Sequence, residues 1–197
     1  MSTGRLESFS DGVLAVAITL LSLDLAVSGP GHGTLAHQLT QRWPSFASYV
    51  VSFLVIGIIW INHHSLFSSL EKIDRVALFL NLLLLLFVVA IPFATATMAE
   101  YLRGGGSDSH LAAAIYGFVS LGMGLAFALM FLWSSRRGHF SVPLDARTRR
   151  RAFVRFSIGN VAYLVAIGLA FVSAWLTLVI VALVAVYYSF DQLDVAP

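Results

Sequence analysis

The sequence predicts an all-α integral membrane protein, and two observations support this fold class. Hydrophobic residues make up 58% of the 197 positions and charged residues only 11%, whereas soluble domains average roughly 45–50% apolar and about 25% charged residues. The apolar residues are also gathered into long runs. This composition excludes a soluble enzyme, a nucleic-acid-binding module and a disordered chain.

The runs predict six transmembrane helices per chain, because a span needs about 20 mostly apolar residues bounded by charges or by Gly and Pro. As one helix, residues 152–190 would be roughly 58 Å long, about twice the thickness of the hydrocarbon core. We therefore expect a helical hairpin that turns near Ser173–Trp175. The six expected spans are Phe9–Val27, Phe46–Ile61, Val76–Met98, Leu111–Trp133, Ala152–Ser173 and Ala174–Phe190.

These spans leave only short connections, so we expect residues 1–197 to form a single six-helix transmembrane domain. The longest connections on the outer side, residues 28–45 and 100–110, are rich in Gly, His and Ser. They have no room for a folded domain of their own.

Basic residues indicate the orientation, because six spans place both termini on the same side of the membrane and cytoplasmic loops are enriched in Lys and Arg. Of the twelve Lys and Arg residues, only Arg42 and Arg103 fall on the opposite side. The sequence therefore predicts a multi-pass protein of the cell membrane with cytoplasmic N- and C-termini. For the basic run at 147–151, which borders a hydrophobic span, a topogenic or lipid-headgroup role is favoured over a nucleic-acid patch. The cytoplasmic set is Arg5, Lys72, Arg75, Arg136, Arg137, Arg147, Arg149, Arg150, Arg151 and Arg155.

The sequence contains no motif typical of an enzyme active site. Zero cysteines exclude disulfides, thiolate catalysis and cysteine-based metal sites. The H-E-x-x-H and G-x-S-x-G motifs are absent as well, so we expect no enzyme and no cofactor. His63 and His64 are adjacent and diverge by about 100° on a helix, which argues against chelation of a metal within one chain.

The first span is the one suited to line a water path, because it holds polar residues where the other spans are rich in Leu, Val, Phe and Ala. Val16, Thr19, Leu20 and Leu23 fall within about 100° of one another on one helical stripe. Spacing alone leaves two interpretations open. In the first, the stripe is an ordinary packing face. In the second, the stripes of several subunits together form a narrow apolar constriction that gates by dewetting.

The start of this span carries an R-x-x-x-F-S-D-G string, from Arg5 to Gly12. It resembles the signature of the transmembrane protein 175 family, the endosomal and lysosomal potassium channels and their prokaryotic homologues. Further family-like features are Trp60-Ile61-Asn62-His63-His64, Asn81 and Pro92-Phe93-Ala94-Thr95.

The resemblance implies a homotetramer in which the first helix of each chain lines a central pore. Bulky apolar residues on that helix replace the carbonyl filter of ordinary potassium channels, and by position they are Val16, Leu20 and Leu23. Thr19 corresponds to a polar layer linked to potassium selectivity. The family usually has Ile or Leu where this chain has Val16, which implies a wider constriction at that ring.

Polar residues at the start of the first span and at the end of the second are expected at the same depth. We expect them to form a buried hydrogen-bond network that fixes the pore helix to its neighbours; for Arg5, Ser10, Asp11 and Trp60 the resemblance supports this role. In the alternative, Ser10 and Asp11 only cap the helix. The expected network is Arg5, Ser10, Asp11, Trp60, Asn62, His63 and His64.

The function favoured by these features is a potassium-preferring, leak-like cation channel, since no span carries the row of arginines that a voltage sensor requires. Asp24, at the outer mouth, either concentrates cations or faces lipid headgroups. The expected partners are the lipid bilayer, monovalent cations including permeant K⁺ and the other chains of a homotetramer, with no nucleic acid. The alternative function is a small secondary transporter or proton-coupled cation carrier.

Overall fold

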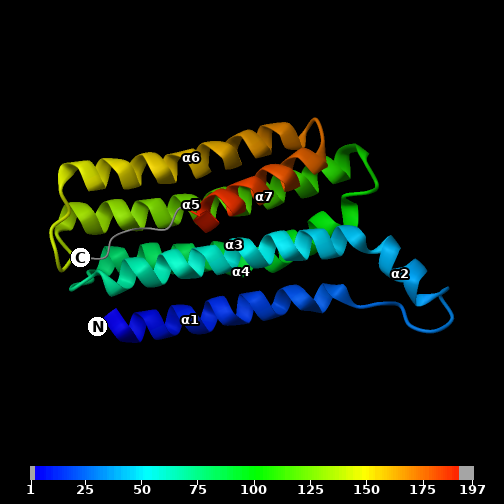
Figure 1. Cartoon of the computed structure of the whole chain (residues 1–197), viewed down its shortest axis with the longest axis horizontal. Coiled ribbons are helices and arrows are strands. Elements are labelled where there is room, and N and C mark those ends of the chain that lie inside the picture. The colour runs from blue at the N-terminus through cyan, green and yellow to red at the C-terminus, as the bar shows by residue number, and fades with distance from the viewer. Residues whose placement is uncertain (1–2, 191–197) are drawn as a thin grey trace.

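The computed structural model describes residues 3–190, which form an elongated bundle of helices (Figure 1). Within the described part of the chain every regular element is a helix, apart from one isolated β-bridge, so the predicted all-α class is confirmed. The elements are α1 (Thr3–Leu20), the short 3-10 helix η1 (Leu21–Leu25), α2 (Leu35–Gln41), α3 (Trp43–Ser68), α4 (Arg75–Tyr101), α5 (Gly106–Arg137), α6 (Ala146–Ala170) and α7 (Ala174–Phe190).

Five of these elements are long and apolar enough to cross a membrane: α1 together with η1, and then α3, α4, α5 and α6. Helix α7 is also strongly apolar but has only 17 residues. The expected hairpin near Ser173–Trp175 is present, with α6 ending at Ala170 and α7 starting at Ala174. The Thr177 hydroxyl donates to the carbonyl oxygen of Ala166 at 3.0 Å and ties the two arms together.

The helices pack in an order that leaves α1 at one edge of the bundle and α6 at the opposite edge (Figure 1). Helix α1 packs on α3 and α4, α4 packs on α5, and α5 packs on α6. Helix α7 contacts α3, α5 and α6. The interior is closely packed, and side chains such as Ile56, Val88 and Phe131 are fully buried.

Helix ends differ from the expected spans because helices continue beyond the apolar residues. Helix α3 runs to Ser68 rather than Ile61, and α6 begins at Ala146 rather than Ala152. The basic run 147–151 is therefore helical and not a loop. Asp145 provides the reason for the early start of α6, since its carboxylate accepts from the backbone N–H of Thr148 at 2.7 Å as an N-cap.

The first expected span and the connection after it also differ from the prediction. The first helix starts at Thr3, tightens into η1 at Leu21 and ends at Leu25, two residues before the expected Val27. The connection 28–45 contains α2, which has only seven residues and no apolar run that would reveal it. The Thr34 hydroxyl caps α2 by accepting from the backbone N–H of His37.

One end of the bundle, here named the basic end, holds the N-terminal end of α1, the α3–α4 turn and the α5–α6 connection (Figure 1, left). The turn and the connection are tied together by backbone hydrogen bonds. The N–H of Glu71 donates to the carbonyl of His139 at 2.9 Å, and the N–H of Ser141 donates to the carbonyl of Ser69 at 3.0 Å. These bonds hold α3, α4, α5 and α6 in register at this end.

Candidate functional site

Helix α1 has two faces with opposite environments. The buried face carries Leu6, Ser10, Leu14 and Ala17 and packs against α3 and α4. The opposite face is exposed, although it is largely apolar. On it, Val16 is 56% exposed, Leu20 38% and Leu23 69%, and Thr19 is exposed between them. We name Val16, Thr19, Leu20 and Leu23 the exposed stripe.

The exposed stripe continues across the change from α-helix to 3-10 helix at Leu21. A 3-10 helix advances about 2.0 Å per residue instead of 1.5 Å, so η1 stretches the stripe without turning Leu23 away from it. The hydroxyl of Thr19 donates to the carbonyl of Val16 at 2.8 Å, and that of Ser22 donates to the carbonyl of Thr19 at 2.8 Å. Both hydroxyl protons are thereby used within the helix, and their oxygens remain able to accept.

Two contacts link the start of α1 to α3 at the surface of the chain. The indole N–H of Trp60 donates to Asp11 Oδ1 at 3.0 Å. One turn earlier on α1, Glu7 Oε1 lies 2.7 Å from His64 Nδ1. The Trp60 and His64 rings also stack, with centroids 6.4 Å apart. The structure thus pairs consecutive turns of α1 with consecutive turns of α3.

A second chain of hydrogen bonds lies in the interior and joins three helices. The Ser10 hydroxyl donates to the Leu6 carbonyl at 3.0 Å, and the Asn81 amide N–H donates to Ser10 Oγ at 2.9 Å. Asn81 Oδ1 in turn lies 2.9 Å from His63 Nε2. Because an amide oxygen only accepts, His63 must carry its proton on Nε2. Ser10, Asn81 and His63 are all fully buried.

Not every expected member of the polar network joins it. Arg5 is exposed, and within residues 3–190 it has no hydrogen bond or ion pair. Asn62 donates to the carbonyl of Ile58 in its own helix at 2.9 Å and lies on the other side of α3 from Trp60. The expected network therefore divides into a buried chain, which includes Ser10 and His63, surface contacts of Asp11, Trp60 and His64, and two residues outside both.

Asp24 lies at the end of the bundle away from the basic end, beside a polar cavity of about 400 Å³. The cavity is lined by η1, by the start of α3 and by the end of α4, and it also holds Arg42, Glu100 and Arg103. Arg42 donates to the Ala26 carbonyl. Arg103 donates to two oxygens of Gln41, one in the side chain and one in the backbone, each at 2.8 Å. The charge of Asp24 is thus set among two cations and a second carboxylate.

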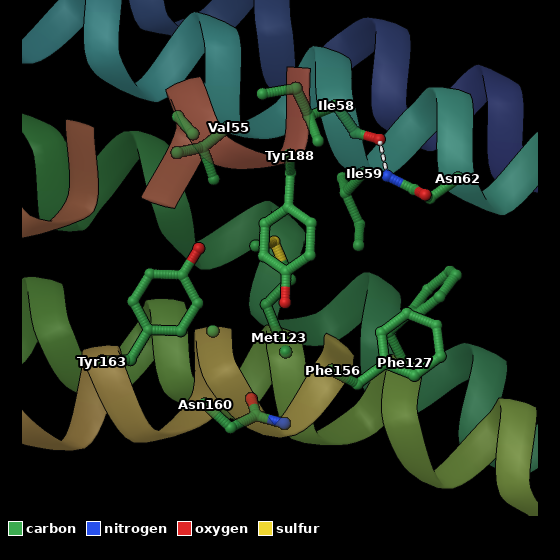
Figure 2. Close-up of a pocket in the computed structure, with 13 residues that line it drawn as sticks. Val55, Ile58, Ile59, Asn62, Met123, Phe127, Phe156, Asn160, Tyr163 and Tyr188 are labelled. Carbon is green, nitrogen blue, oxygen red and sulfur yellow. Dashed lines mark hydrogen bonds between the residues drawn. The ribbon is translucent and has the colours of Figure 1, made fainter. Parts of the chain in front are cut away.

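A smaller apolar cavity of about 50 Å³ lies between α3, α5, α6 and α7, and no residue of α1 lines it. Figure 2 shows Tyr188 crossing from α7 with its hydroxyl directed toward α6, between Tyr163 on one side and Phe127 and Phe156 on the other. The Tyr188 hydroxyl donates to the Arg155 carbonyl at 2.9 Å. This cavity is separate from the exposed stripe.

Two polar parts of the interior were not among the residues expected to form a hydrogen-bond network. Asn81 is the central member of the buried chain, and its signal was a lone amide within a span that is otherwise almost wholly apolar. A second polar cluster lies deeper, where Ser52 Oγ is 2.7 Å from Thr95 Oγ1 and 2.9 Å from the Tyr116 hydroxyl. Such buried polar groups need partners from neighbouring helices, which a sequence alone does not identify.

Comparison with known proteins finds relatives over nearly the whole chain. The family model described as endosomal/lysosomal potassium channel TMEM175 matches residues 5–92. A potassium channel of Streptomyces collinus is 51% identical over 195 residues, covering 98% of this chain and 94% of that protein. The endosomal/lysosomal proton channel TMEM175 of Gallus gallus is 37% identical over 110 residues, which are 51% of this chain and 22% of that protein.

A solved structure has the same fold. The crystal structure of a lysosomal potassium-selective channel TMEM175 homologue from Chamaesiphon minutus superposes with a TM-score of 0.83. Its sequence is 34% identical, and the match covers 95% of this chain and 96% of that one.

Proposed function

The chain belongs to the TMEM175 family, and on this premise we propose that it is a potassium-preferring, leak-like cation channel of the cell membrane. Members of this family are ion channels, so the chain is not an enzyme. The observation that carries the proposal is the exposed stripe of α1. An apolar face that stays exposed along a helix whose other face is packed is suited to contact neighbouring copies of the chain or lipid, and we assign it to neighbouring copies because the same span also holds polar residues.

The proposed arrangement is a homotetramer of six-span chains, each a single domain. The sixth span is α7, whose 17 residues reach about 26 Å as a helix, close to the roughly 30 Å of the hydrocarbon core. Both termini are placed in the cytoplasm, because the three segments at the basic end carry all the basic residues except Arg42 and Arg103.

In the proposed pore, four copies of α1 surround the axis with their exposed stripes. Rings of Val16, Leu20 and Leu23 then form a narrow apolar constriction, and Thr19 adds a ring of hydroxyl oxygens. A narrow apolar ring makes an ion shed part of its hydration shell. Potassium is more weakly hydrated than sodium, so partial dehydration costs it less free energy and the ring favours potassium. Because only part of the shell is lost, the proposed selectivity is modest. The small side chain of Val16 makes its ring the widest of the three.

The contacts at the basic end have a supporting role in this proposal. The buried chain of Ser10, Asn81 and His63 and the surface pair of Asp11 and Trp60 hold α1 against α3 and α4. They would keep the exposed stripe at a constant angle to the pore axis. Arg5, Asn62 and His64 belong to the same region, and in the proposal Asp24 attracts cations to the outer mouth.

The test is a bilayer recording of the purified protein with potassium on one side and sodium on the other. A reversal potential that favours potassium supports the channel. Equal permeability to both ions would contradict potassium preference and leave an unselective pore. The family relatives are named potassium channels in bacteria and proton channels in animals, so the recording is repeated with a proton gradient in the absence of other permeant ions.

The second candidate function is a small secondary transporter or proton-coupled cation carrier. A carrier turns over one substrate at a time, so its flux saturates with ion concentration and shows no single-channel steps. The two candidates therefore separate in the same recording. Saturating flux without unitary current would overturn the channel in favour of the carrier.

A further inference from the structure

Seven of the twelve basic residues lie in one short stretch at the basic end of the bundle. Between Arg136 and Arg155, the only acidic residue is Asp145. The stretch includes the end of α5 and the first turns of α6. We name it the arginine-rich segment. Its arginines are Arg136, Arg137, Arg147, Arg149, Arg150, Arg151 and Arg155.

Orientation in the membrane does not by itself require this clustering. The other two segments at the same end, the start of α1 and the α3–α4 turn, carry only Arg5, Lys72 and Arg75. A topogenic role would be served as well by an even distribution of charge over the three segments. The concentration of positive charge in the segment that joins α5 to α6 therefore points to a local anionic partner.

The four arginines in the first turns of α6 carry charges that no ion pair in the described part of the chain neutralises. Within residues 3–190, no carboxylate forms an ion pair with Arg147, Arg149, Arg150 or Arg151, and all four are exposed. The one nearby acid, Asp145, is the N-cap of α6 through the N–H of Thr148. It also attracts Arg147 and Arg151, without forming an ion pair with either, and among the described residues it leaves Arg149 and Arg150 without a neighbouring acid.

The arginines continue directly into an apolar surface on the same face of α6. At about 100° per residue, Arg147, Arg150 and Arg151 share an arc of about 100° with four apolar residues further along the helix. Those four side chains are about half exposed, from 48% at Ile158 to 59% at Val161. The face therefore presents cations at its start and hydrocarbon beyond. The four apolar residues are Val154, Ile158, Val161 and Val165.

The segment is also held in place, which favours a defined site over a mobile tail. The Trp133 indole N–H donates to both oxygens of Asp74, at 3.1 and 2.9 Å, and the Arg137 guanidinium stacks 4.6 Å from the centre of the Trp133 ring. On α6, the Arg155 carbonyl accepts from the Tyr188 hydroxyl of α7. Both α5 and α6 are therefore anchored to neighbouring helices at this end.

From these observations we propose that the arginine-rich segment binds the phosphate headgroup of an anionic phospholipid in the leaflet at the basic end, with its acyl chains on the outward face of α6. Clusters of basic residues beside a membrane span attract anionic lipid, and guanidinium groups suit phosphate oxygens. A nucleic acid would match the charge but not the apolar surface beyond it. The inference rests on the membrane placement in the proposed function but not on ion conduction.

The test measures lipid binding to the purified chain in detergent by native mass spectrometry, with phosphatidylglycerol and phosphatidylcholine offered at equal concentrations. We expect the wild type to prefer phosphatidylglycerol. A basic residue near a membrane contributes about 1 kcal/mol, or about fivefold in affinity. The Arg150→Gln/Arg151→Gln variant should therefore lose at least about tenfold of the preference.

The matched control is Lys72→Gln/Arg75→Gln, which removes two charges at the same end and should keep the preference. Arg150→Lys/Arg151→Lys keeps the charge and should retain most of the binding, which separates loss of charge from loss of fold. No preference in the wild type, or equal losses in both Gln variants, would overturn the proposal. Co-purifying nucleic acid together with indifference to lipid charge would overturn it in favour of a polyanion. None of these readouts needs an ion current, so they stand apart from the bilayer recording.

Discussion

Asn81 of α4 and Ser10 of α1 meet in the interior of the bundle, where the amide N–H donates to the hydroxyl oxygen at 2.9 Å. Each partner makes a further hydrogen bond, since the Ser10 hydroxyl proton goes to Leu6 and Asn81 Oδ1 accepts from His63. The three side chains form one directed chain of donors across α3, α4 and α1. It links the helix that carries the exposed stripe to the two helices beneath it.

Replacing Asn81 should destabilise the protein more than replacing Asn62, which precedes His63 on α3. Asn81→Ala leaves the buried N–H of His63 without an acceptor, which costs about 1–3 kcal/mol. Asn62→Ala removes only a bond within its own helix and should cost less than about 1 kcal/mol. Unfolding in detergent, followed by circular dichroism, measures the difference. Equal losses in the two variants would mean that the buried chain adds nothing.

The surface pair of Asp11 and Trp60 should behave as one unit. Asp11→Ala and Trp60→Phe each remove the same hydrogen bond, so the double variant should lose little more than either single variant. A hydrogen bond to a charged group contributes about 1.5–3 kcal/mol at most, and exposure reduces this value. The double-mutant cycle, from unfolding in detergent, is the measurement, and gel filtration shows whether each variant keeps the oligomeric state of the wild type. Fully additive losses would show that the pair is not coupled.

The pairing of α1 with α3 shows how far the depth of a residue in its membrane span predicts its contacts. Asp11 and Trp60 were expected at one depth, and the structure brings them within hydrogen-bonding distance. Depth does not predict rotation about the helix axis, and for that reason Asn62, two residues after Trp60, lies on the other side of α3. Asn81 was named only as a family-like residue and not assigned to the network, since its partners come from two other helices.

Helix ends and the short helix were hard to predict for a different physical reason. Hydropathy marks where a helix is apolar, whereas its ends depend on caps such as Asp74 and Asp145 that lie outside the apolar run. Helix α2 has seven residues and depends on contacts with its surroundings. The direction in which the exposed stripe faces is set by the contacts of α1 with α3 and α4, which helical periodicity within one span does not specify.

Two glycines of α6 should respond in opposite ways to substitution by alanine, and of the two only Gly159 lines the cavity of Figure 2. A Cβ atom at Gly159 would lie 2.4 Å from the Tyr188 hydroxyl, so Gly159→Ala must displace that side chain and its bond to Arg155. We expect a loss of about 1–3 kcal/mol from overpacking. At Gly168, no atom lies within 4 Å of the place that a Cβ would take, so Gly168→Ala should be neutral or stabilise by up to about 1 kcal/mol. Thermal unfolding of both variants decides, and a destabilised Gly168→Ala would refute the reasoning.

The N-cap of α4 predicts a loss of stability in acid. Partial burial raises the pKa of Asp74, but hydrogen bonds from the Ala77 N–H and the Trp133 indole, together with nearby His139, bring the pKa below its ordinary value of 3.8. A lowered pKa stabilises the folded state above the ordinary value, and this contribution is lost as the pH falls through the folded-state pKa.

The variant Asp74→Asn isolates that charge, because Asn is also a good N-cap. The wild type should be the more stable protein at pH 6, and the difference should close as the pH falls below about 3.8. Melting temperatures across this range provide the measurement, with Asp108→Asn at the exposed start of α5 as the control. A difference between wild type and Asp74→Asn that does not change with pH would refute the assignment.

The exposed stripe gives the prediction closest to the proposed function. Leu23→Ala and Val16→Ala remove bulk from the side of α1 that faces away from α3 and α4, so folding and assembly should be preserved. If the stripe forms the constriction, both variants widen it, and conductance should rise while the permeability ratio of potassium to sodium moves toward one. Val16→Leu should narrow the ring and shift the ratio the other way.

Leu164→Ala on α6 is the matched control, since Leu164 is 61% exposed, comparable to Leu23 at 69%. Reversal potentials and unitary currents are compared for the four variants. Unchanged permeation in Leu23→Ala and Val16→Ala would return the stripe to a packing face, because an apolar ring that restricts ions cannot lose its side chains without effect.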